Sequence, residues 1–304
     1  MPELPDITVY GERILAMAKG QSLIGLRIAR PFVLRTVNPA PEALAGQALL
    51  DVSRIGKRIV LAFENDLFAV IHLMIAGRLH WRGPGNAIPR GNGMFSFDFA
   101  TGCLMMTEAS TKRRASLHLL AGAAALKQFE RGGIDLMSAS TADISAVLRQ
   151  RNRTLKRALT DPSIVDGIGN AYSDEILHRA RLSPFVLTGG LPDEAIARLV
   201  DATRAVVTEW IDRLREQAGD GFPAKVTAFR PEMAVHGKYG EPCPVCGVPV
   251  QRIVYAENEA NYCPGCQTGG RVLADRSLSR LLKDDWPRSV DELERLHPTP
   301  EGMR

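Results

Sequence analysis

Apolar and polar positions follow two different patterns along the chain. Residues 7–19 carry apolar side chains at helical spacing, whereas residues 23–108 carry short apolar or alternating runs separated by Gly, Asn and Pro. The first pattern predicts a helix near the chain start, and the second predicts strands of a sandwich or barrel. The predicted strands are residues 49–53, 59–63, 68–73, 94–99 and 103–107.

The middle third of the chain returns to helical spacing. The predicted helices are residues 139–149, 154–159, 171–180 and 191–217, the last strongly amphipathic. Residues 218–238 are typical of a flexible connection. The tail has leucines at helical spacing (Leu278, Leu281, Leu282) and a capping-box pattern at Ser289 and Glu292.

The composition limits which classes of protein the chain can belong to. The 304 residues are 45% hydrophobic and 24% charged, which is typical of a soluble protein with two domains or one domain with appendages. No apolar run is long enough to span a membrane and no signal peptide is evident, so we expect a cytoplasmic protein without a membrane partner. The net charge of +4 permits a polyanionic partner. Basic clusters at 54–58, 112–114 and 149–157 are either binding surfaces or solvated faces.

Four of the five cysteines form two Cys-x-x-Cys pairs. They are Cys243, Cys246, Cys263 and Cys266. This spacing places four thiolates around one Zn²⁺, and a closed shell of four thiolates indicates a structural metal rather than a redox site. The fifth, Cys103, lies in an apolar run and is expected to be a small buried hydrophobe.

Two short motifs carry further chemistry. Removal of Met1 would leave Pro2 as a secondary amine beside the carboxylate of Glu3, and an α-amino group has an ordinary pKa of about 7.7–8.0, so part of it is nucleophilic at neutral pH. A proline at position two also occurs by chance. The loop 167–170 (Gly-Ile-Gly-Asn) could hold a phosphate at a helix start or simply cap that helix.

Taken together, the motifs resemble those of a known family. The motifs are residues 1–6, Lys57, His72-Leu73-x-x-Ala76-Gly77, the loop ending in Asn170 with residues 172–177 after it, and residues 262–267. In this order they are similar to the formamidopyrimidine-DNA glycosylases and endonuclease VIII, and the resemblance covers about residues 1–270.

The resemblance implies an α+β multidomain protein. Its parts would be an N-terminal β-sandwich domain with an N-terminal helix (1–134), a helix-two-turn-helix domain (135–222), a linker and zinc ribbon (223–274), and an extension of unknown role (275–304). The partner would be double-stranded DNA with damaged bases or abasic sites. We expect a monomer that associates with the nucleoid in a bacterium.

The resemblance also implies residue roles in a glycosylase with AP-lyase activity. Pro2 would attack C1′ and form a Schiff base, Glu3 would protonate the sugar ring oxygen, and Lys57 would assist at the phosphate and lesion. Lys156 and Asn170 match phosphate-binding positions. Amine, acid and cations are what β-elimination at an abasic sugar requires.

Three departures from the family pattern change the expected activity. Asn258 replaces the arginine linked to δ-elimination, Met74 takes a glycine's place beside the inserting Ile75, and the loop with Arg113 and Arg114 has no aromatic wedge. We therefore expect mainly β-elimination, weak excision of 8-oxoguanine opposite cytosine, and preference for abasic sites and oxidised or mispaired pyrimidines.

The sequence is also compatible with three alternatives to a glycosylase with AP-lyase activity. The chain could be an AP lyase that excises few bases, or a non-catalytic protein that binds DNA damage. It could also be a zinc-ribbon protein with an unrelated sandwich. An N-terminal Pro2 with Glu3 favours an enzyme, because a binding protein does not need the amine.

Overall fold

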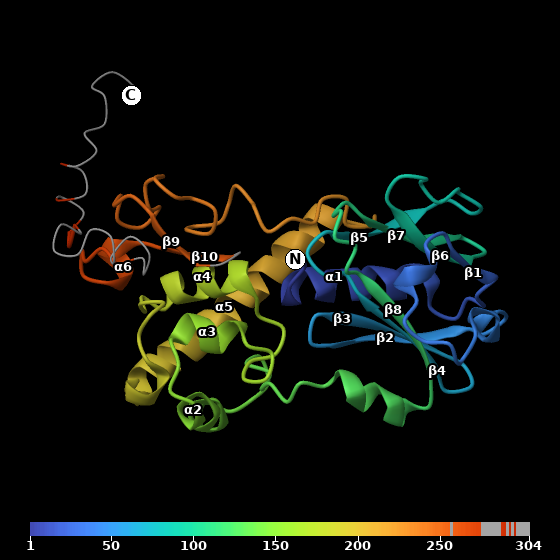
Figure 1. The fold of residues 1–304 in the computed structure, drawn as a ribbon, viewed down its shortest axis with the longest axis horizontal. Coiled ribbons are helices and arrows are strands. Elements are labelled where there is room, and N and C mark those ends of the chain that lie inside the picture. The colour runs from blue at the N-terminus through green and yellow to red at the C-terminus, as the bar shows by residue number, and fades with distance from the viewer. Residues whose placement is uncertain (256–257, 275–286, 290–291, 293–294, 296–304) are drawn as a thin grey trace, which may run out of the picture. The chain divides into compact units, whose positions relative to one another are not determined.

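The computed structural model describes residues 1–255, 258–274, 287–289, 292 and 295 (Figure 1). Its contacts group into a sheet unit, Met1–Gly133 with Val207–Ala228, and a helix–ribbon unit, Ile134–Val206 with Phe229–Arg304. Each unit has its own core. Most of the predicted extension 275–304, including Leu278, Leu281 and Leu282, lies outside the described residues, but Ser289 Oγ accepts the N–H of Glu292 as the capping pattern predicts.

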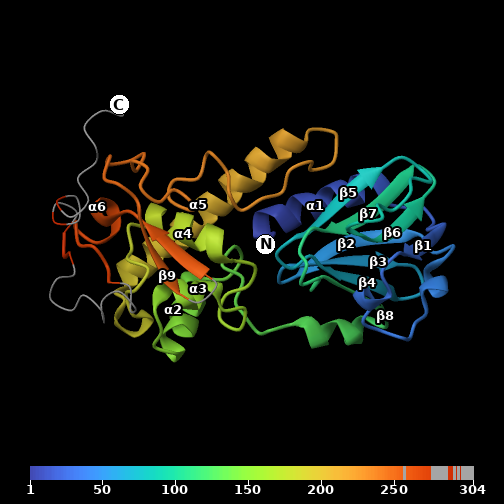
Figure 2. The ribbon, with the colours of Figure 1, turned by 45° about the horizontal axis from the view of Figure 1, so that its top comes forward.

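The sheet unit contains two four-stranded antiparallel sheets (Figure 2). The first has the order β1 (Gly25–Ile28), β6 (Gly93–Phe99), β7 (Gly102–Glu108) and β5 (Gly77–Arg82). The second has the order β2 (Leu49–Ile55), β3 (Arg58–Phe63), β4 (Leu67–His72) and β8 (Ser116–Ala121). One apolar cluster takes side chains from both sheets, among them Leu61 and Phe97, so the predicted β-sandwich is confirmed.

Helix α1 (Leu4–Ala18) packs its apolar side into the same core through Ile7, Tyr10 and Ile14. It starts three residues earlier than the apolar pattern predicts, because the carboxylate of Asp6 accepts the backbone N–H of Glu3 (3.0 Å) and stabilises the first turn. The short 3-10 helices of this unit are η1 (Pro31–Val33), η2 (Pro41–Leu44) and η3 (Ala123–Phe129).

The helix–ribbon unit contains the helices predicted from the middle third of the chain, together with a short helix and two strands of the ribbon. The helices are α2 (Thr141–Gln150), α3 (Leu155–Thr160), α4 (Asn170–Arg179) and α6 (Pro264–Gln267), with the 3-10 helix η4 (Thr188–Gly190); α5 (Asp193–Ala218) divides its residues between the two units. The ribbon strands are β9 (Gln251–Tyr255) and β10 (Asn258–Tyr262), paired antiparallel. Among the described helices, none combines the length and apolar content needed to cross a bilayer.

Candidate active site and zinc centre

The start of the chain is held tightly at the N-terminus of α1. Pro2 and Glu3 are both buried, and α1 begins at the next residue, so the backbone cannot swing freely. The backbone N–H of Ile7 donates to the carbonyl of Glu3 (2.9 Å), which adds to the bond from Glu3 to Asp6. A short tether to a buried helix therefore fixes where the terminal amine lies.

Charged groups of both signs surround this amine. Burial lowers the pKa of the Met1 α-amino group below its ordinary value, Glu3 and Asp6 act in the opposite direction, and Arg78 and Lys57 lower it further. A lowered pKa increases the fraction of unprotonated amine at neutral pH. The structure thus brings together the three predicted catalytic positions, since Lys57 lies in the β2–β3 turn within electrostatic reach of the N-terminus.

The turn between β4 and β5 carries the predicted inserting residues. Ile75 lies in this turn and is 62% exposed. Met74 has a φ of 51°, in the left-handed region that favours glycine. A Cβ on Gly77 would lie 2.3 Å from the carbonyl oxygen of Leu73, so only glycine fits the end of this turn.

Arg78 is a residue of this site that sequence reasoning missed. Its guanidinium donates to the carbonyls of Ile75 (3.1 Å) and Gly77 (2.7 Å) within the turn, and to the carbonyl of Val226 (2.5 Å). It therefore joins the turn to the segment after α5. Its position directly after the His72–Gly77 motif was the only available signal.

The loop between β7 and β8 carries Arg113 and Arg114. The buried carboxylate of Glu108 accepts the backbone N–H of Arg114 (2.9 Å), which fixes the end of the loop. Arg113 has a φ of 41° and its guanidinium lies 5.9 Å from the centre of the Phe32 ring, a cation–π contact. The loop has no aromatic residue of its own, but a partly exposed ring from η1 lies against it. No local signal in the sequence marks Phe32.

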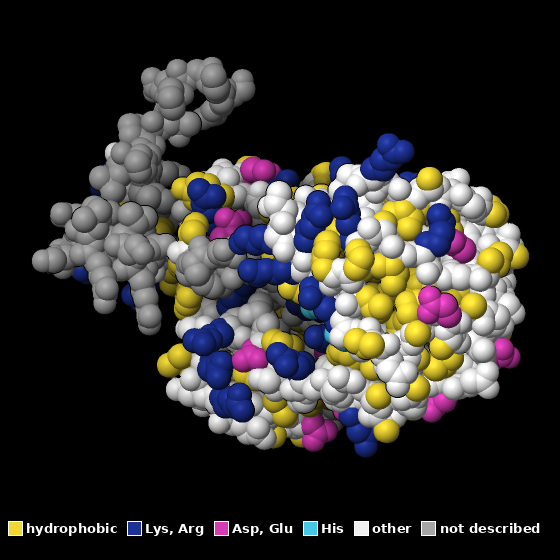
Figure 3. All heavy atoms as spheres, turned by 45° about the vertical axis from the view of Figure 1, so that its right-hand side comes forward, with side chains coloured by type: hydrophobic (Ala, Val, Ile, Leu, Met, Phe, Trp, Pro, Cys, Tyr) yellow, Lys and Arg dark blue, Asp and Glu magenta, His cyan; other side chains and the backbone are white. Residues whose placement is uncertain are grey.

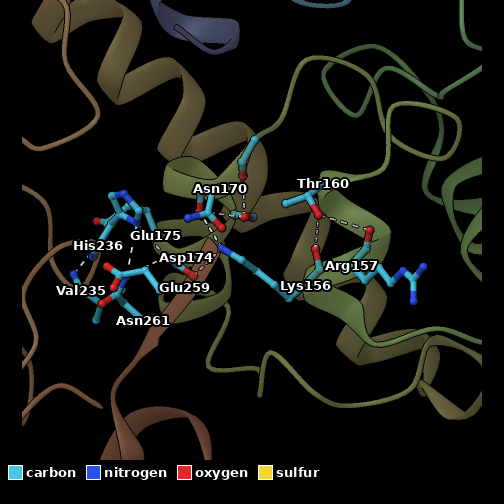
Figure 4. Close-up of polar contacts among 12 residues, drawn as sticks. Lys156, Arg157, Thr160, Asn170, Asp174, Glu175, Val235, His236, Glu259 and Asn261 are labelled. Carbon is cyan, nitrogen blue, oxygen red and sulfur yellow. Dashed lines mark hydrogen bonds and ion pairs between the residues drawn. The ribbon is translucent and has the colours of Figure 1, made fainter. Parts of the chain in front are cut away.

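Lys156 and Asn170 meet in a buried polar network of the helix–ribbon unit (Figure 4). Lys156 is buried, and its ammonium donates to the carbonyl of Asn170 and to the carboxylate of Asp174, each at 2.6 Å. The other oxygen of Asp174 lies 2.8 Å from Nδ1 of His236. Lys156 therefore holds the first turn of α4 from inside, and Asn170 begins that helix.

The four ribbon cysteines form one cluster. Sγ of Cys243 lies 3.8 Å from Sγ of Cys266, and Sγ of Cys246 lies 3.3 Å from Sγ of Cys263. Thiolates about 2.3 Å from one zinc ion in a tetrahedron are about 3.8 Å apart, so the cluster fits a single ion. The ribbon holds one structural Zn²⁺, as the spacing predicts.

The cluster also contains a residue that the sequence did not indicate. Nε2 of His178, in the last turn of α4, lies 3.3 Å from Sγ of Cys243. By contrast, the lone Cys103 is buried on β7, as predicted.

Asn258 is the first residue of β10 and pairs with Tyr255 in the ribbon hairpin. The next residue, Glu259, lies 3.7 Å from the guanidinium of Arg252. Lys and Arg side chains gather on the face shown in Figure 3. Residue 258 at the start of β10 is therefore an asparagine, and it is followed by a carboxylate that lies near an arginine of β9.

A β-sandwich that carries the chain start, a helical unit and a zinc ribbon follow one another along the chain, and this is the domain order of DNA glycosylases with a helix-two-turn-helix unit. Family profiles agree over three segments: the formamidopyrimidine-DNA glycosylase N-terminal domain matches residues 1–116, its H2TH domain 135–218, and the zinc finger found in FPG and IleRS 240–269.

Individual proteins give the same result. The formamidopyrimidine-DNA glycosylase of Solibacter usitatus is 30% identical over 278 residues, covering 88% of this chain and 99% of the relative. An uncharacterized formamidopyrimidine-DNA glycosylase-like protein of Mycobacterium tuberculosis is 42% identical over 151 residues, covering 50% of this chain and 94% of that protein. The Lactococcus lactis Fpg in complex with abasic-site DNA has a TM-score of 0.77 at 23% identity, covering 88% of this chain and 99% of that one. The chain belongs to the formamidopyrimidine-DNA glycosylase family, whose members are DNA glycosylases of base excision repair.

Proposed function

We propose that this protein is a bifunctional DNA glycosylase and AP lyase that uses Pro2 as its nucleophile. The observation that carries the proposal is the geometry of the N-terminal cluster: Pro2 and Glu3 are buried directly before α1, and Lys57 lies within electrostatic reach of the chain start. A nucleophilic amine, an acid and a cation are the groups that Schiff-base chemistry at C1′ needs.

The steps follow from these groups. The lone pair of Pro2 nitrogen attacks C1′, the glycosidic bond breaks, and the base leaves with the bonding electrons and takes up a proton. Glu3 protonates the ring oxygen as the sugar opens, and the Pro2 nitrogen, having lost its proton, forms an iminium with C1′. Removal of a C2′ proton then expels the 3′ phosphate, and water releases the remaining sugar from Pro2.

The DNA contacts are also part of the proposal. The partner is double-stranded DNA with damaged bases or abasic sites, as in the Lactococcus lactis Fpg complexes. Asn170 would hold a phosphate at the start of α4, with Lys156 supporting it from behind. The side chains that would contact DNA at the flipped nucleotide and in the ribbon are Met74, Ile75, Arg113, Arg114 and Asn258.

Borohydride trapping on abasic-site DNA tests the nucleophile. We expect a covalent adduct that maps to the N-terminal peptide, and a strong decrease in trapping rate for Pro2→Gly because a primary amine then takes over. Glu3→Gln is the matched control, since it keeps the amine and should slow base release more than trapping of an abasic site. An adduct on an internal lysine would overturn the assignment.

A second candidate is an AP lyase with little base excision. The left-handed Met74 in a glycine's place and the absence of a ring within residues 109–115 favour it. Single-turnover rates on matched duplexes decide between the two. We expect slow release of 8-oxoguanine opposite cytosine and faster processing of abasic sites and oxidised pyrimidines, mainly by β-elimination. Fast 8-oxoguanine release with selectivity for opposite cytosine would contradict this expectation.

A further inference from the structure

A helix of the helix–ribbon unit reaches into the zinc centre. His178 lies in the last turn of α4, is only 6% exposed, and places Nε2 at 3.3 Å from Sγ of Cys243. Its ring nitrogen and the sulfurs of Cys243, Cys263 and Cys266 all lie within 4.8 Å of one another. The histidine is therefore either a ligand of the ion or a partner of one ligand.

The four thiols leave no position on the ion for the histidine. The sulfurs of Cys246 and Cys263 lie 3.3 Å apart and those of Cys243 and Cys266 lie 3.8 Å apart, so the four ribbon thiols supply a shell of four without His178. A structural zinc is four-coordinate. Once zinc is bound, Cys243 is a thiolate and can only accept a hydrogen bond, so the contact requires an N–H on Nε2 of His178.

The other thiolates show why such a donor is needed. Four thiolates around one Zn²⁺ carry a net charge of about −2, and charge in a buried site requires donors. Sγ of Cys263 accepts the backbone N–H of Cys266 (3.4 Å), and Cys246 accepts the backbone N–H of Val248. These donors are local to the ribbon, whereas the donor to Cys243 comes from a helix 65 residues earlier in the chain.

We propose that His178 is a positioning residue of the zinc centre: its Nε2–H donates to the zinc-bound thiolate of Cys243 and so joins the first cysteine pair to α4. The second pair is already joined to the same region, because the side chain of Gln267 donates to the carbonyl of Leu182 (2.9 Å) and accepts the N–H of Cys263 (2.8 Å). The ribbon is thus attached at both cysteine pairs. Since α4 begins at Asn170, the metal helps to position the proposed phosphate contact.

The first test compares zinc release from the intact protein into excess chelator under native conditions. His178→Phe removes the donor but keeps a ring, and we expect release to be at least about tenfold faster, as for other partners of metal ligands. His178→Gln, which keeps an amide N–H, should restore most of the slow release. His80→Gln is the control, because His80 lies in the sheet unit, where its Nε2 is 2.8 Å from Oγ1 of Thr107 and the residue has no part in the ribbon. Equal release rates for all variants would overturn the proposal.

A second measurement needs no variant. In protein loaded with ¹¹³Cd and labelled with ¹⁵N, a scalar coupling from the His178 N–H proton to the metal through sulfur is expected, with a cadmium shift typical of four thiolates. A direct one-bond coupling between the metal and the histidine nitrogen would show that His178 is a ligand and would contradict the proposal. The absence of any coupling would contradict it as well.

Discussion

At the scale of single residues, His72 shows how burial sets a charge state. It pairs with Arg58 across β3 and β4. Burial, followed by the charges of Arg58, Lys57 and His118, lowers the pKa of His72 to about 4. The side chain is therefore neutral at neutral pH, next to the turn that carries Ile75.

This lowered pKa predicts a loss of stability in acid. Between pH 6.5 and 4 the unfolded chain binds a proton that the native His72 does not, so the free energy of unfolding falls as pH falls, by about 3 kcal/mol across the window. His72→Gln lacks this pH-dependent contribution. The difference in free energy of unfolding between the parent and His72→Gln should therefore change between pH 6.5 and 4 and stay constant above pH 7. Urea unfolding at pH 7, 5.5 and 4.5 measures it. Parallel pH profiles would contradict the prediction.

Gly77 gives a second prediction at this scale. A Cβ there would lie 2.3 Å from the Leu73 carbonyl oxygen and 2.8 Å from Cε of Met106, and the backbone atom cannot move away cheaply. Gly77→Ala should lower the free energy of unfolding by about 1–3 kcal/mol. Gly83→Ala is the control, because nothing lies within 4 Å of its Cβ position, and it should stay within about 0.5 kcal/mol. Equal effects in urea unfolding would refute the steric argument.

Residue chemistry was predictable where it depends on spacing along the chain. The cysteine pairs and the Met1–Glu3 motif are local, so the sequence alone indicated the zinc centre and the pairing of a terminal amine with a carboxylate. Arg78, Phe32 and His178 were not predictable, because their partners are distant in the chain. Arg78 and Val226, for instance, are 148 residues apart.

At the scale of elements, the network around Lys156 fixes the start of α4. Lys156 on α3 and Asp174 on α4 form an ion pair with side chains 2% and 0% exposed. Asp174 also accepts from Asn261 on β10 (3.3 Å). Two helices and one ribbon strand thus depend on a single carboxylate.

Removing one partner of this pair should be costly. Lys156→Met leaves a buried carboxylate without its ammonium and should lower the free energy of unfolding by about 3–5 kcal/mol. The double variant Lys156→Met with Asp174→Asn removes the uncompensated charge and should recover a large part of that loss. Urea unfolding of the parent, the two single variants and the double variant gives the coupling free energy between Lys156 and Asp174. If Lys156→Met weakened DNA binding while its stability stayed unchanged, Lys156 would instead act on the phosphate directly.

The elements themselves were predicted unevenly. The long amphipathic α5 was predicted from its helical spacing, and strands β2, β3, β4, β6 and β7 were predicted from short apolar or alternating runs. Strands β1, β5 and β8 were missed. In β5 the polar residues Arg78, His80 and Arg82 alternate with Leu79 and Trp81, so the strand pattern was present in the sequence although the segment was not predicted as a strand.

At the scale of the whole molecule, the charge distribution governs the long-range attraction between the protein and DNA. The net charge is only +4, with 38 basic and 34 acidic residues, so affinity depends on where individual cations lie. The ribbon turn is a place where this chain carries less positive charge than its resemblance to the family implies, since Asn258 and Glu259 stand at the start of β10.

Asn258 therefore predicts the salt dependence of DNA binding. Each phosphate contact releases about 0.9 counterion, so Asn258→Arg should steepen the slope of log affinity against log salt by about 0.9 and tighten binding most at low salt. Asn258→Gln is the matched control, because it lengthens the side chain without adding charge, and its slope should equal that of the parent. Fluorescence anisotropy with an abasic-site duplex over a range of salt concentrations provides both slopes. An arginine at 258 that leaves the slope unchanged would mean that the ribbon turn does not approach the DNA backbone, and the loss of the family arginine would then have no electrostatic consequence.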